Sequence, residues 1–106
     1  MTMLDLIAKE YIAIVELLES EKGYEPQNNR IIIEREEFKI LLERYAFATF
    51  TYKTKAYKDL NFIIHDNESY TMPYKDKQLR KTVRKVIINY KAYKAIKRLY
   101  NTIINL

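Results

Sequence analysis

The chain has 106 residues, 48% of them hydrophobic, and a formal net charge of +5, which bounds it to one small basic domain, residues 1–106, with a single core. Its lack of cysteine, single histidine and single glycine argue against disulfides, thiolate metal sites and glycine-rich phosphate loops, so we expect no metal, no cofactor and no enzymatic activity. The N-terminus lacks the features of a signal peptide and no apolar run is long enough to span a bilayer, which predicts a cytoplasmic protein without membrane contact.

The first predicted element is a helix over residues 3–21, with Thr2 and Asp5 as a capping box at its start. Gly23 suits the end of this helix because glycine tolerates positive φ, and Asn28-Asn29 predicts a turn. Helical spacing places six apolar residues on one face: Leu4, Ile7, Tyr11, Ile14, Val15 and Leu18.

A β-branched segment, Arg30 to Ile33, predicts a short strand, and helical periodicity returns directly after it. The apolar stripe of this second helix consists of Phe38, Leu41, Leu42, Tyr45 and Ala48. A third, short helix is predicted from Thr54, its N-cap, to Asn61, a residue suited to a left-handed cap.

Alternation from Ser69 to Tyr74 and a β-branched run from Arg80 to Asn89 predict a hairpin with a basic tip at residues 75–78. Pro73 places the first strand at an edge, because proline has no amide hydrogen to donate. A fourth helix follows, almost to residue 106. Its apolar residues have the 3-4-3 spacing of a coiled-coil seam, which indicates packing or dimerisation, and we predict a homodimer through Tyr93, Ile96, Tyr100 and Ile103.

Acidic and basic residues are divided between the two halves of the chain. Residues 1–50 carry 6 Lys and Arg against 10 Asp and Glu, whereas residues 51–106 carry 13 against 4, which leaves −4 and +9. A second half this basic suits a polyanion such as nucleic acid better than a small neutral ligand. Two helices with a tight connection, followed by a basic hairpin, predict an α+β fold of the winged helix-turn-helix type, with helices packed on a small antiparallel sheet and its wing hairpin.

On such a fold the third helix would enter the major groove of double-stranded DNA, and the wing, residues 70–89, would contact the backbone or a neighbouring groove. Arg80 and Arg84 could make bidentate guanine contacts, and Gln78 could read adenine. The residues suited to phosphates on the helix are Lys53, Lys55 and Lys58.

Three segments carry a family resemblance: Thr-Tyr-Lys-Thr-Lys-Ala-Tyr-Lys-Asp-Leu-Asn-Phe-Ile from Thr51, Ser-Tyr-Thr-Met-Pro-Tyr from Ser69, and Val-Arg-Lys-Val-Ile-Ile-Asn up to Asn89. They resemble small winged helix-turn-helix proteins of Firmicute mobile elements, in particular relaxosome accessory proteins of clostridial conjugative plasmids. The resemblance implies a dimer that binds short repeats at a plasmid origin of transfer, together with other relaxosome proteins, and contacts DNA mainly through the wing. On that basis the main contacts are Lys75, Lys77, Gln78, Arg80, Lys81, Arg84 and Lys85.

Two other functions are open at this point. The same fold could serve a transcriptional or copy-number regulator of a mobile element, whose site would lie at a promoter. A protein-interaction or inhibitor module whose basic surface binds an acidic protein is an alternative of a different class. It would have no appreciable DNA affinity at physiological salt.

Overall fold

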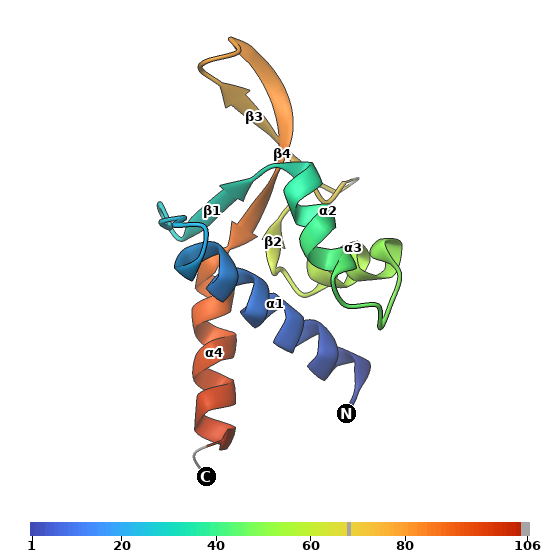
Figure 1. Ribbon diagram of the computed structural model, residues 1–106. Coiled ribbons are helices and arrows are strands. Elements are labelled where there is room, and N and C mark those ends of the chain that lie inside the picture. The colour runs from blue at the N-terminus through green and yellow to red at the C-terminus, as the bar shows by residue number, and fades with distance from the viewer. Residues whose placement is uncertain (68, 105–106) are drawn as a thin grey trace.

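Four helices and four strands follow one another along the part of the chain that the computed structural model describes, residues 1–67 and 69–104, with side chains to residue 101 (Figure 1). The α+β class is thereby confirmed. None of these described helices is long and apolar enough to cross a membrane. In chain order the elements are α1 (Met3–Ser20), β1 (Arg30–Ile33), α2 (Arg35–Glu43), α3 (Phe50–Asp59), β2 (Ile63–Ile64), β3 (Met72–Asp76), β4 (Lys81–Asn89) and α4 (Tyr90–Ile104).

β4 is the long strand on which the sheet is built. β1 and β2 pair antiparallel with its C-terminal half, one on each side, which gives the order β1-β4-β2. β3 pairs with its N-terminal half, from Met72 opposite Lys85 to Asp76 opposite Lys81. The nine residues of β4 extend over about 30 Å, so the strand leaves the helices and carries the β3–β4 hairpin out of the body (Figure 1). The molecule is therefore long and narrow, 50 × 27 × 24 Å.

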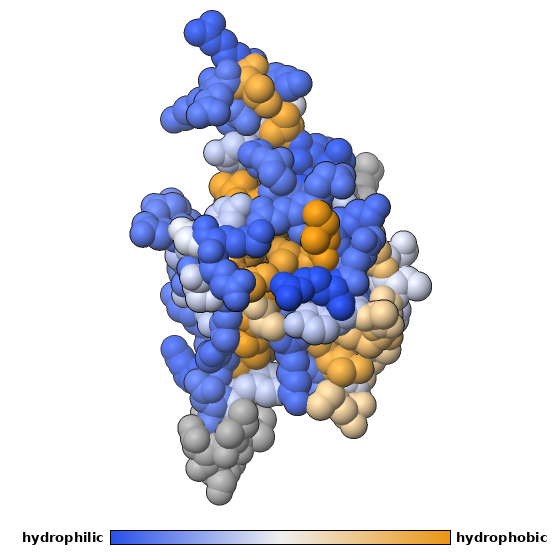
Figure 2. Space-filling view, viewed as in Figure 1, coloured by the Kyte–Doolittle hydropathy of each residue, from blue (hydrophilic) through white to orange (hydrophobic). Residues whose placement is uncertain are grey.

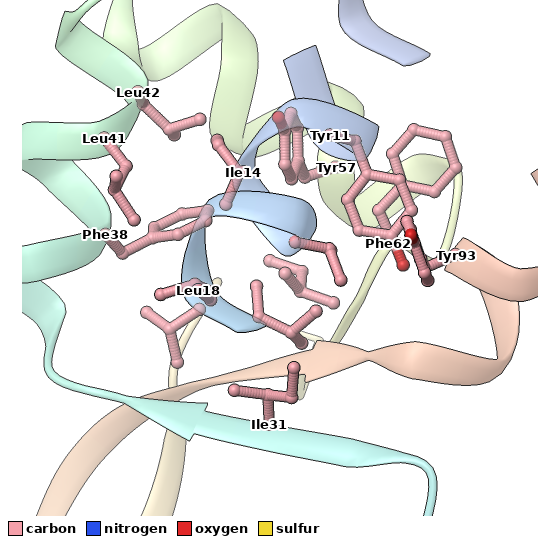
Figure 3. Packing of buried hydrophobic residues seen from close by; sticks show 14 of the residues in the cluster. Tyr11, Ile14, Leu18, Ile31, Phe38, Leu41, Leu42, Tyr57, Phe62 and Tyr93 are labelled. Carbon is pink, nitrogen blue, oxygen red and sulfur yellow. The ribbon is translucent and has the colours of Figure 1, made fainter. Parts of the chain in front are cut away.

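The core lies between the sheet and helices α1, α2 and α3, with a group of aromatic rings on the side of α4 (Figure 3). Tyr11 stacks on Phe62 with ring centroids 4.1 Å apart and meets Tyr57 and Tyr93 edge-on. Its hydroxyl donates a hydrogen bond to the Asn89 carbonyl, where β4 passes into α4. Burying these rings removes a large apolar area from water and fixes α1 against the sheet.

The signals predicted at the two ends of the first helix and in the turn before β1 are confirmed. The Thr2 hydroxyl accepts from the Asp5 amide at 3.1 Å, and the Asp5 carboxylate accepts from the Thr2 amide at 3.2 Å. Gly23 has a φ of +70°, and Asn28 and Asn29 have φ values of 54° and 59° in the turn before β1. These residues let the chain reverse without the strain that a bulky side chain would suffer there.

The predicted boundaries of the second and third helices are wrong. α2 ends at Glu43 and does not reach Ala48, and α3 begins at Phe50, four residues before the predicted cap. Thr49 is the actual N-cap, and its hydroxyl accepts from the Tyr52 amide at 3.1 Å. Thr54 lies inside α3 and is buried. The hairpin is confirmed, but its turn covers residues 77–80 and β3 is shifted to Met72–Asp76.

A buried ion pair between Lys53 and Glu10 explains these boundaries. Lys53 Nζ donates to Glu10 Oε2 at 2.6 Å and to the carbonyls of Leu42 at 2.6 Å and Tyr45 at 2.5 Å, which uses all three ammonium hydrogens. The other Glu10 oxygen accepts from the Tyr57 hydroxyl at 2.8 Å. The carbonyls of Leu42 and Tyr45 therefore accept from the ammonium group. In a longer α2 they would instead accept backbone hydrogen bonds within the helix.

Breaking this pair should destabilise the protein strongly. Lys53→Met is expected to lower the free energy of unfolding by about 3–5 kcal/mol, because the Glu10 carboxylate stays buried without its cation. Urea denaturation followed by circular dichroism measures the change. The double variant Glu10→Leu/Lys53→Met should recover most of the loss, and a double variant no more stable than the single one would contradict the assignment.

The unfolding free energy of Lys53→Met should also depend more strongly on pH than that of the wild type. Burial raises the pKa of Glu10 above its usual 4.5, and the hydrogen bonds from Lys53 and Tyr57 oppose that rise. Without Lys53 the pKa of Glu10 in the folded state rises further. A carboxyl whose folded pKa is raised stabilises the fold at low pH and loses this effect as pH increases through the folded pKa. The unfolding free energy of Lys53→Met should fall above about pH 4.5 more steeply than that of the wild type.

Candidate nucleic-acid interface

α3 offers less cationic surface than the sequence predicted. Lys53 is 0% exposed in the ion pair with Glu10, so its assignment as a phosphate contact is wrong. Lys55 is exposed but forms an ion pair with Asp59 one turn later at 2.8 Å, and the hydrogen bond that it donates to Asp59 raises the pKa of Lys55. Lys58 is half-buried near the end of α3. The exposed side of this helix therefore carries both signs of charge.

Arg84 lies at the root of the hairpin and is held by the body of the protein. Its Nε donates to Thr71 Oγ1 at 2.7 Å, while one terminal nitrogen donates to Asp66 Oδ2 at 2.6 Å and to the Thr71 carbonyl at 2.9 Å. These hydrogen bonds occupy the guanidinium edge that a bidentate guanine contact would need. Arg84 is therefore placed to position the hairpin, and the prediction that it reads a base is not supported by its geometry.

Lys85 supports the same root from the opposite face of β4. Its Nζ donates to Glu34 Oε1 at 2.7 Å and lies 5.0 Å from the centre of the Tyr74 ring. The Glu34 hydrogen bond raises the pKa of Lys85, which stays charged and only 14% exposed. Arg84 and Lys85 thus fix the hairpin from both sides, and the sequence prediction had assigned both of them to DNA.

The hairpin tip carries the cations that are open to solvent. Among the described residues, none forms an ion pair with Lys75, Lys77, Arg80 or Lys81, and Gln78 is exposed beside them. Figure 2 shows the hairpin projecting from the body, with hydrophilic surface at its tip and a strip of hydrophobic surface along it. In the turn, Leu79 is 58% exposed.

The turn at the tip has a defined shape. Asp76 Oδ1 accepts from the amides of Gln78 at 2.9 Å and Leu79 at 3.0 Å, and the Leu79 hydrogen bond is the main reason that the pKa of Asp76 is lowered. Arg80 closes the turn with a φ of 54°, a conformation that costs a residue with a side chain roughly 1 kcal/mol or more. The tip is thus an ordered cationic turn, in which a strained residue carries a guanidinium group outward.

The apolar seam of α4 packs against α1 of the same chain. Tyr93 is buried in the core, while Ile96 and Tyr100 are partly buried against it. The Tyr100 hydroxyl donates to Asp5 of α1 at 3.2 Å, and Lys97 forms an ion pair with Glu16. The seam predicted for dimerisation is therefore largely used inside the chain, and the assignment of Tyr93 to a dimer interface is wrong. The side chain of Ile103 lies outside the described residues.

The sequence did not reveal which acidic residues form ion pairs with the lysines and arginines and so remove some of them from the candidate DNA-binding surface. Glu10, Glu34 and Asp66 were not singled out in the sequence as the partners of Lys53, Lys85 and Arg84. Each meets its cation across 18 or more positions of the chain, so no local pattern could reveal it.

Residues of the polar loop after β2 form hydrogen bonds that hold the loop in place. The ring nitrogens of His65 lie 2.8 Å from the Asp66 carbonyl and 3.1 Å from the Lys58 carbonyl, and Ser69 Oγ is bonded to Thr71. His65 and Ser69 therefore tie the loop to the end of α3 and to the strand that follows. Within the described part of the chain no group of three His, Cys, Asp or Glu side chains could hold a metal ion.

No protein-family model matches the chain, and no curated protein matches it significantly. The family resemblance stays a prediction, and the function is argued from the geometry above.

Arg84→Ala should loosen the hairpin even without any ligand. Loss of the hydrogen bonds to Asp66 and Thr71 removes the anchor of the root, so the amides of β3 should exchange with deuterium faster, by about tenfold for each 1.4 kcal/mol lost. Arg80→Ala, at the tip, is the matched control and should leave β3 exchange unchanged. Equal exchange in both variants would show that Arg84 does not position the hairpin.

Proposed function

We propose that this chain is a sequence-specific, non-enzymatic protein that binds double-stranded DNA through the tip of the β3–β4 hairpin. The observation that carries the proposal is the ordered cationic turn at the end of a hairpin that projects from the body (Figure 1). Phosphate groups attract such exposed cations, and a narrow two-stranded ribbon fits a groove of the duplex.

The order of elements supports a winged helix-turn-helix as the finer description of the fold. α2 and α3 are joined by the short connection 44–49, and the hairpin follows α3 after the small strand β2. β1, β4 and β2 form the sheet under these helices, with the hairpin as its extension. In this arrangement α3 is the recognition helix and β3–β4 is the wing.

The charges favour a wing-centred contact over one centred on α3. The wing offers Lys75, Lys77, Arg80 and Lys81, whereas α3 has lost Lys53 to the core and pairs Lys55 with Asp59. Phosphate contacts by the three lysines alone would give a slope of log affinity against log salt of about −2.7. Such contacts carry little sequence preference, so base discrimination would depend on the groups that reach base edges, Arg80 and Gln78.

The process served by this binding is proposed from the resemblance alone. The resemblance to relaxosome accessory proteins such as TcpK suggests binding to repeats at a plasmid origin of transfer, with other relaxosome proteins as partners, in the cytoplasm. Transcriptional or copy-number control by the same fold is the second candidate. A site selected from random duplexes separates the two, because it would match either repeats at a nick region or a promoter.

Salt titrations test the wing. With a duplex selected from a random pool, fluorescence anisotropy across salt should give Lys77→Ala/Lys81→Ala a slope shallower than that of the wild type by about 2, since two phosphate contacts are lost. The double variant should bind more weakly than the wild type at every salt concentration below the one at which their plots of log affinity against log salt cross.

The control is Lys91→Ala/Lys94→Ala, which removes the same two charges from exposed positions on α4. Its slope should stay close to that of the wild type. If both double variants lose affinity and slope equally, binding depends only on net charge and the wing has no special role. If the wild type binds no duplex at physiological salt, the interaction-module alternative takes its place.

Arg80→Gly should separate function from stability. Glycine adopts the φ of 54° at this position without strain, so the thermal midpoint should hold or rise, by an amount worth up to about 1 kcal/mol. Discrimination between the selected duplex and a scrambled one should fall by about 1–3 kcal/mol, because the guanidinium contact to a base is lost. A variant that keeps full discrimination would exclude Arg80 as the base-reading residue.

A further inference from the structure

The exposed ridge of α2 has an acidic residue at one end, an apolar residue in the middle and a basic residue at the other end, so it is complementary to a second copy of itself in the opposite direction. Glu36, Ile40 and Arg44 are four residues apart, and Arg44, the C-cap residue, keeps helical dihedral angles, so the three side chains lie along one ridge. All three are exposed, Ile40 by 64%. Neither Glu36 nor Arg44 forms an ion pair with another residue of the described chain.

We infer that this ridge is the interface at which two copies of the chain form a two-fold symmetric dimer. When two such ridges meet antiparallel, Ile40 contacts Ile40 of the partner, and Glu36 of each copy faces Arg44 of the other. A two-fold axis requires this self-complementarity, and here a negative end, an apolar centre and a positive end supply it. The same ridge is poorly suited to DNA, because Glu36 and Glu43 on its exposed side repel phosphates.

Apolar surface extends the interface beyond the ridge. A small cavity of about 90 Å³ beside Arg44 is lined by Leu17, Leu41 and Tyr45, and Tyr45 is 46% exposed. In Figure 2 hydrophobic surface continues below α2 over the α2–α3 connection and the start of α1. A partner on the ridge would cover part of this surface, which no other described element of the chain covers.

The arrangement has a consequence for the two hairpins. α2 begins near the hairpin root and runs away from it toward α3 (Figure 1). Antiparallel pairing of two α2 helices therefore points the two hairpins in opposite directions, so that one dimer presents two cationic tips far apart.

Sedimentation equilibrium of the full chain, without DNA, tests the interface independently of the proposed function. The wild type should show a monomer–dimer equilibrium, and Ile40→Asp should raise its dissociation constant at least about tenfold. Leu99→Asp, at a 54% exposed leucine on α4, is the matched control and should leave it unchanged. Circular dichroism establishes that each variant is folded.

A charge exchange gives the sharper test. Glu36→Arg and Arg44→Glu should each weaken the dimer, because each places like charges opposite one another, while the double variant Glu36→Arg/Arg44→Glu should restore it. A wild type that is monomeric at every concentration, or a double variant as weak as the single ones, would overturn the interface.

Discussion

The Lys53–Glu10 ion pair is the interaction on which the helical half of the molecule depends. It joins α3 to α1 inside the core, and its remaining hydrogen bonds fix the last carbonyls of α2 and the start of the connection. The Phe47 ring, 4.2 Å from the ammonium nitrogen, covers it from the connection. A buried charge pair is costly to desolvate, and it persists here because its donors and acceptors are satisfied. The pair therefore acts chiefly to specify one relative placement of three helices.

In the sheet, the single strand β4 contributes to both the core and the projecting hairpin. The C-terminal half of β4 buries Val86 and Ile88 under the helices, whereas its N-terminal half carries polar and charged residues. The change occurs at Arg84 and Lys85, whose ion pairs lie on opposite faces of the strand. The change from buried apolar residues to polar and charged residues along β4 thus marks the boundary between the scaffold and the candidate binding surface.

Much of the fold could be predicted because its signals are local. The Thr2 capping box, the turn at Asn28-Asn29 and the hairpin follow from spacing and residue type. Most of the two predicted helix faces is also buried, but Leu4 and Tyr45 are exposed. The site could be predicted only in part, because lysines look alike in a sequence. Lys53 is buried, Lys85 is paired and Lys77 has no ion pair with any described residue, and partners distant along the chain decide among these states. The early start of α3, four residues before the predicted cap, was missed for the same reason, since Lys53 has to face inward.

The junction at Asn89 has a mechanical consequence. β4 ends at Asn89 and α4 begins at Tyr90 with no loop between them, and the Asn89 side chain accepts from the Ala92 amide at 3.2 Å and donates to the Asn61 carbonyl at 2.8 Å. A load applied to the hairpin tip would travel along the strand directly into the helix, because no flexible linker can absorb it. A force on the hairpin would therefore reach α4 without first being taken up by a loop between the two elements.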